Sequence, residues 1–112
     1  MKSEIKDIGD VRIIRLAGKI TIGAGDVHMR ELVDRALAEG KKKILLDLED
    51  VSTIDSSGIG EMVSCYTTVA RNGGQLKLLR LSPKINDILQ VTQLITVFDV
   101  FDDQQEAIAS FS

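Results

Sequence analysis

Two adjacent serines are the residues of this sequence best placed to do chemistry. Ser56 and Ser57 follow Asp55 and precede Gly58 and Gly60, at the start of a segment with helical periodicity. Unpaired backbone N–H groups and the helix dipole favour negative charge at a helix N-terminus. A hydroxyl there could help to bind a phosphate, or could itself be phosphorylated. The plainer alternative is that one serine caps the helix and Asp55 orders the turn.

The glycines at positions 58 and 60 favour a role beyond capping. Glycine inside a helix is less favourable than alanine by up to about 1 kcal/mol, so two of them in one first turn call for a reason. Without side chains, they leave room for the active site of another protein to approach the serine hydroxyl.

The other reactive side chains do not form a catalytic or metal-binding set. His28 is the only histidine and Cys65 the only cysteine, and no ligand cluster stands at metal spacing around His28. The serines lack the Gly-x-Ser-x-Gly elbow of hydrolases, and neither glycine pair, 23/25 or 58/60, gains a third glycine or a Walker lysine. We therefore expect no enzymatic activity, no metal and no cofactor, with Cys65 semi-buried as a small apolar residue.

Composition narrows the class of protein further. The chain has 112 residues, of which 44% are hydrophobic and 28% charged, as expected for one globular domain over residues 1–112. A formal net charge of −3 argues against binding nucleic acid by counterion release. The first ten residues do not resemble a signal peptide, and no apolar run is long enough to cross a membrane. With a single cysteine, the chain fits a reducing, cytoplasmic compartment, without membrane insertion.

The first half of the sequence predicts a hairpin, a helix and a central strand. Strands are expected at 4–7 and 11–16 around the turn dipeptide Gly9-Asp10. A loop over 20–25 then leads to Asp26 as the cap of a helix over 27–39. The run from Ile44 to Leu48 is apolar on both faces, as in a strand covered by helices, and we expect a loop from Glu49 onward.

The second half continues the alternation of helix and strand. A helix is expected from Gly58 to Arg71, ending at Asn72-Gly73-Gly74, and then a strand over 76–81. Ser82 and Pro83 predict the cap and first residue of a third helix. The sequence also favours a short edge strand over 97–101 and a last helix that begins at Asp102. The expected fold is α/β, a mostly parallel sheet of four or five strands with an N-terminal β-hairpin and about four helices.

The segment from Leu48 to Gly60, with its Asp-Ser-Ser-Gly core, closely resembles the signature of the STAS domain in bacterial anti-sigma factor antagonists. The resemblance extends along the whole chain. It includes Leu16-Ala17-Gly18 at a strand end, the first helix, Gly73-Gly74 before a strand and Leu81-Ser82-Pro83 before the third helix. The resemblance implies the STAS fold.

The resemblance also implies a mechanism and its partners. In that family the first serine after the aspartate, here Ser56, is phosphorylated by a serine kinase that is also an anti-sigma factor. The dephosphorylated antagonist binds this kinase and frees the sigma factor, and a PP2C-type phosphatase resets the switch. The expected partner-binding residues lie in the serine segment and in the loop after the first glycine motif: Lys19, Thr21, Asp55, Ser56, Ser57, Gly58, Gly60 and Glu61.

Several alternatives stay open from the sequence. Many family members carry acidic residues where this chain has Lys19 and Thr21, so the cognate kinase and sigma factor are not identified. The chain could instead be a fixed STAS subunit of a stressosome-like or lipid-transport complex, or a small-molecule module for a nucleotide or lipid headgroup. Ser57 could also be phosphorylated, and a monomer or a weak dimer is expected.

Overall fold

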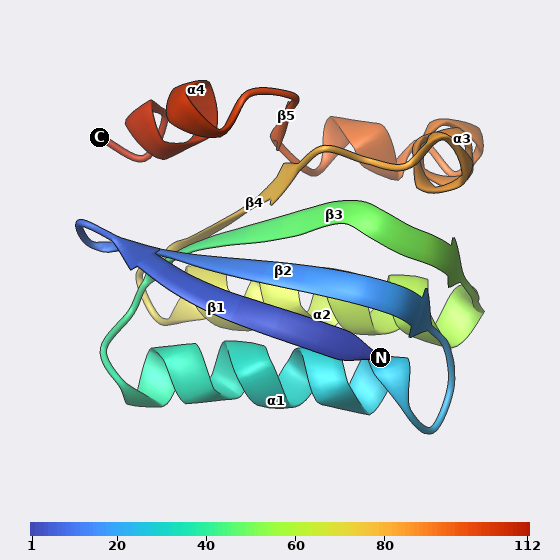
Figure 1. Cartoon of the computed structure of the whole chain (residues 1–112), viewed down its shortest axis with the longest axis horizontal. Coiled ribbons are helices and arrows are strands. Elements are labelled where there is room, and N and C mark those ends of the chain that lie inside the picture. The colour runs from blue at the N-terminus through green and yellow to red at the C-terminus, as the bar shows by residue number, and fades with distance from the viewer.

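The computed structural model describes all residues from 1 to 112 and contains a mixed sheet flanked by helices (Figure 1). Strands β1 (Lys2–Ile8) and β2 (Val11–Ile20) form an antiparallel hairpin. Strands β3 (Lys43–Ile54), β4 (Gln75–Leu79) and β5 (Val100–Phe101) follow in parallel, so the sheet has the order β1-β2-β3-β4-β5. The predicted fold class, including the hairpin and the parallel sheet, is confirmed.

Four helices cover the sheet unevenly. Helices α1 (Gly25–Ala38) and α2 (Ser56–Arg71) lie side by side under one face, as Figure 1 shows. Helix α4 (Gln104–Ala109) lies toward the other face, whereas α3 (Pro83–Val91) and a 3-10 turn (Leu94–Thr96) pack against the same core cluster as α1 and α2. None of the helices is long and apolar enough to span a membrane.

The buried apolar side chains form two clusters, one on each side of the sheet. The larger cluster contains 20 buried residues, mainly from β2, β3, α1 and α2, and extends to Ile85 and Leu89 of α3. The smaller contains six, in which Ala107 and Phe111 cover Leu45 and Leu79. The central strand is therefore apolar on both parities because it is packed on both faces, as the sequence predicts.

Strand β3 is much longer than the sequence predicts. Residues 49–54, expected to be a loop, continue the strand alongside β2 as far as Ile54, which pairs with Ile20. The register of this pairing shifts between Arg15 and Ala17 and again between Gly18 and Lys19. The extension carries the chain to the start of α2, so a strand rather than a flexible loop presents the serines.

Several local predictions at element ends are wrong: β2 runs to Ile20 rather than ending at residue 16, and β4 ends at Leu79 rather than at residue 81. Helix α1 begins at Gly25 with Ala24 as its N-cap, whereas the Asp26 side chain bonds its neighbour's amide, on Val27, at 2.8 Å. Helix α4 is capped by Asp103 rather than Asp102. Strand β5 keeps only two of the five predicted residues, because Phe98 is buried and packs edge-on against Tyr66 instead. The Ser82 cap and the Pro83 start of α3 are as predicted.

Candidate functional site

Asp55 caps helix α2 and ties it to a second loop. One carboxylate oxygen accepts a hydrogen bond from the Gly58 amide at 2.8 Å, and the other accepts from the Ile22 amide at 3.0 Å. These two N–H groups, Gly58 first, lower the pKa of Asp55, because hydrogen bonds to a carboxylate stabilise its charged form. Asp55 therefore does the capping that the sequence analysis considered for a serine, and α2 begins at Ser56, two residues earlier than expected.

The two serines lie in the first turn of α2, and they differ in exposure. Ser56 is the first helical residue and is exposed, whereas Ser57 is half-buried. The Asp55 carboxylate holds the helix start from the other side, so the Ser56 hydroxyl is not needed as a cap. A side chain without a structural hydrogen bond at an exposed helix start is accessible to another protein.

The loop after β2 lies directly against this helix start. The amide of Asp55 donates to the carbonyl of Ile20 at 3.4 Å, in addition to the bond from Ile22 to its carboxylate. The structure thus brings the segment that contains Lys19 and Thr21 together with the Asp55–Glu61 segment. Lys19 is exposed and Thr21 half-buried. All the predicted site residues fall at one end of the molecule.

The two glycines of the first turn have different surroundings. A Cβ atom on the buried Gly58 would lie 2.1 Å from the Ile20 carbonyl oxygen, so the close approach of the two segments requires glycine there. A Cβ atom on the exposed Gly60 would meet nothing within 4 Å. Packing therefore explains Gly58, and it leaves Gly60 without a structural reason.

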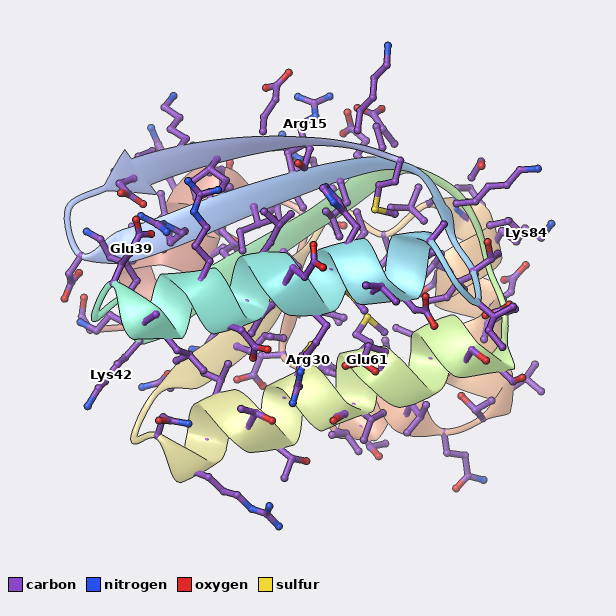
Figure 2. All side chains as sticks on the ribbon, turned by 90° about the horizontal axis from the view of Figure 1, so that it is seen from below. Arg15, Arg30, Glu39, Lys42, Glu61 and Lys84 are labelled. Carbon is purple, nitrogen blue, oxygen red and sulfur yellow. The ribbon has the colours of Figure 1, made fainter.

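Glu61 faces helix α1 rather than open solvent. Its carboxylate lies 3.5 Å from the Nε of Arg30, which also approaches Asp34 at 3.5 Å. Figure 2 shows Arg30 and Glu61 between the two helices. Because both groups are partly exposed, the pair adds little stability, but it fixes the direction of the Glu61 side chain. Arg30 was not among the residues predicted from sequence, since its helical spacing alone does not reveal which neighbour it faces.

Ile22 is a second residue that the sequence analysis did not single out for the site. Its side chain is 73% exposed, in the loop that Asp55 holds against α2. An apolar side chain this exposed beside a serine accessible to other proteins is suited to contact with a partner. A β-branched residue within a short glycine-containing loop was the signal in the sequence that could have identified it.

Cys65 and His28, the other potentially reactive side chains, are held by contacts within the fold. Cys65 is fully buried rather than semi-buried, and burial raises the pKa of its thiol to about 11 against the opposing effect of Arg30. At neutral pH the thiol therefore stays protonated, and a protonated thiol is a poor nucleophile. The His28 ring lies 2.9 Å from the Ser3 hydroxyl, and no three His, Cys, Asp or Glu side chains converge at metal-binding distances.

Comparison with known proteins identifies the family of this chain. The family model for the STAS domain matches residues 2–107. The chain is a STAS domain of the anti-sigma factor antagonist family. It is 33% identical over 87 residues to the anti-sigma-B factor antagonist of Bacillus subtilis, covering 78% of each chain. It is also 28% identical to a putative anti-sigma factor antagonist of Thermotoga maritima, over 91% of this chain and 90% of that one.

Solved structures agree with this membership of the STAS family. A crystal structure of a putative anti-sigma factor antagonist from Thermotoga maritima superposes with a TM-score of 0.88 at 27% identity, covering 97% of this chain and 93% of the other. The anti-sigma factor antagonist SpoIIAA in its unphosphorylated form shares the fold, with a TM-score of 0.71 at 21% identity over 97% and 96% of the two chains. The fold of this chain therefore agrees with that of solved anti-sigma factor antagonists.

The Asp55 cap gives a pH-dependent prediction for this STAS domain. Because the folded-state pKa is lowered, the cap contributes stability above the unfolded-state pKa of about 3.9, and this contribution is lost as pH falls through the lower folded value. Asp55→Ala should thus lower the melting temperature at pH 7, and its difference from wild type should shrink below about pH 4.

Asp55→Asn is the matched control for this measurement. Asparagine can keep the cap to the Gly58 amide with its one carbonyl oxygen, but it carries no charge and cannot accept the second bond from Ile22. Asp55→Asn should therefore melt between Asp55→Ala and wild type at pH 7, and its own side chain should add no pH dependence below pH 4. A difference between wild type and Asp55→Ala that remained constant from pH 7 to pH 2 would contradict a charged cap.

Proposed function

We propose that this protein is a phosphorylation-controlled antagonist of an anti-sigma factor that is also a serine kinase. In its dephosphorylated form it binds the kinase through a docking surface made of Lys19, Thr21, Ile22 and the Asp55–Glu61 segment, and the sigma factor is released. Phosphorylation of Ser56 ends this binding, and a PP2C-type phosphatase restores it.

The exposed position of Ser56 at the start of α2 is the observation that carries the proposal. The Asp55 carboxylate caps the helix, so modification of the Ser56 hydroxyl removes no hydrogen bond from the fold. Ser57 is half-buried in the same turn, which makes Ser56 the more accessible hydroxyl. Support also comes from relatives named as anti-sigma factor antagonists, and from SpoIIAA, a protein of this fold known in a phosphorylated form.

The expected effect of the phosphate is local. It adds about −1.5 to −2 charges beside the Asp55 carboxylate, at the centre of the proposed docking surface. In a closed interface this charge would lose its hydration without a dedicated cation, at a cost of several kcal/mol. About 5.5 kcal/mol turns a population from 99:1 to 1:99, so the switch needs no rearrangement of the fold.

The carboxylate at the helix start argues against an anionic small molecule as the ligand. A free phosphate or nucleotide at this N-terminus would meet the Asp55 carboxylate where the Gly58 amide would otherwise be available. The same helix start therefore favours a protein partner over an anionic ligand.

Phosphorylation by candidate kinases tests the proposal. Incubation with ATP and anti-sigma kinases encoded in the same genome, followed by mass spectrometry of the peptides, should place one phosphate on Ser56. The reaction should persist in Ser57→Ala and disappear in Ser56→Ala. A protein that stays unmodified with every kinase, or that is modified only outside the first turn of α2, would remove the proposed switch and favour a fixed STAS subunit.

A further inference from the structure

We propose that the free edge of β1 pairs with the same edge of a second copy of this chain, forming a weak dimer with a continuous sheet. Strand β1 is the first in the sheet order and has β2 as its only neighbouring strand, as Figure 1 shows. Its seven residues, Lys2–Ile8, therefore present one row of backbone N–H and C=O groups to solvent. Such a row is a template for pairing with another chain. This proposal does not rest on the proposed function.

The two edges of the sheet differ in their capacity to pair. The opposite edge is β5, which has only two residues and is too short to support a ladder. A very short edge strand is one way in which proteins prevent association. Strand β1 has neither a short length nor a covering element, and it contains no proline. Its charged side chains are the only feature that opposes pairing, so their arrangement decides whether pairing occurs.

Symmetry restricts the registers that two β1 strands can adopt. Two copies related by a two-fold axis perpendicular to the sheet pair in antiparallel fashion and keep the same face on the same side. Because side chains alternate between the faces, directly opposite residues must then have the same parity. Only registers centred on a residue meet this condition.

The charges of β1 favour one of these registers. In the register centred on Ile5, all seven residues of β1 are paired. Glu4 of each copy then lies opposite Lys6 of the other copy. Centred on Glu4, that carboxylate would oppose its own copy, and centred on Lys6 the two ammonium groups would oppose each other. Like charges directly opposite are destabilising, whereas opposite charges and apolar pairs stabilise a ladder. The longest register is thus also the complementary one.

The side chains that this register uses are available. Glu4 and Lys6 are exposed, and neither takes part in an ion pair within the chain. Ile5 is 39% exposed although it pairs with the buried Ile14 of β2, so its own copy would cover the remaining apolar surface. Charge complementarity and an uncovered apolar centre therefore coincide on the open edge.

A charge-swap series tests the dimer, with analytical ultracentrifugation over a concentration range. Wild type should dimerise weakly, and Glu4→Lys and Lys6→Glu should each weaken self-association by roughly tenfold, since each places like charges opposite twice. The double variant E4K/K6E should recover wild-type association. An equimolar mixture of the two single variants should form a heterodimer, because all four opposed charges then attract.

Lys2→Glu is the matched control, because Lys2 lies opposite Ile8 in this register and its change should leave association unaltered. Recovery in the mixture shows that both single variants are folded, and far-UV circular dichroism checks each alone. A wild type that stays monomeric at millimolar concentration would overturn the proposal. A dimer that the single variants leave unchanged would overturn it too, since association would then use another surface.

Discussion

Ser56→Asp should bind the cognate anti-sigma kinase roughly a hundredfold more weakly than wild type, whereas Ser56→Ala should bind about as tightly as wild type. The aspartate places a fixed negative charge at the exposed start of α2, beside the Asp55 carboxylate. The expected loss of affinity requires that the complex desolvates this charge without pairing it to a cation, Lys19 of the same docking surface included. Isothermal titration calorimetry or surface plasmon resonance with the purified kinase measures it.

The melting temperatures of the same variants separate binding from folding. A negative charge in the first turn of a helix is favourable to the helix dipole, so Ser56→Asp should melt close to wild type. Ser57→Asp is the comparison variant. Because Ser57 is half-buried, a charge at this position should lower the melting temperature of the protein. Equal affinity of the alanine and aspartate variants at position 56 would argue strongly against the switch.

Gly58→Ala should destabilise the protein by about 1–3 kcal/mol, although it adds a single methyl group. That Cβ would lie 2.1 Å from the Ile20 carbonyl oxygen and 2.7 Å from Cγ1 of Ile54. The Ile20 carbonyl is backbone at the end of β2 and cannot rotate away as a side chain can, so the loop after β2 has to shift. The free energy of unfolding, from urea denaturation, measures the loss.

Gly60→Ala is the matched control in the same helical turn. Its Cβ would meet nothing within 4 Å, and alanine loses less conformational freedom on folding, so stability should rise by roughly 0.5–1 kcal/mol. If Gly60 serves the approach of a partner, this more stable variant should still bind the kinase more weakly. Equal unfolding free energies for the two alanine variants would show that the close approach at Gly58 does not hold in solution.

The positions of the elements were largely predictable because they depend on local chemistry. Apolar spacing placed α1 and α2, and the Ser82 cap with Pro83 placed the start of α3. The apolar run from Ile44 to Leu48 identified a central strand, since residues that face helices on both sides must be apolar on both parities. Each of these signals involves residues close together in the sequence, so it does not depend on contacts with distant elements.

The element ends were less predictable because neighbours distant in sequence decide them. Residues 49–54 of β3 contain Glu49, Asp50 and Ser52, which suggest a loop, yet pairing with β2 continues the strand to Ile54. Cys65 became fully buried because α1 packs over that position of α2, and Arg30 lies 3.7 Å from its sulfur. Neither result follows from the residues next to each position.

By itself the sequence determined which segment we propose as the site, because the Asp-Ser-Ser-Gly core is contiguous and its residue types suit a helix start. Only the tertiary structure decided how that segment is held and what remains free. The Asp55 carboxylate accepts from the amide of Ile22, 33 positions earlier in the chain, and Ser56 beside it is exposed. The physical reason is that a backbone N–H group can be satisfied by any acceptor that the sheet brings within hydrogen-bond distance, and the bulged pairing of β2 with β3 brings this one.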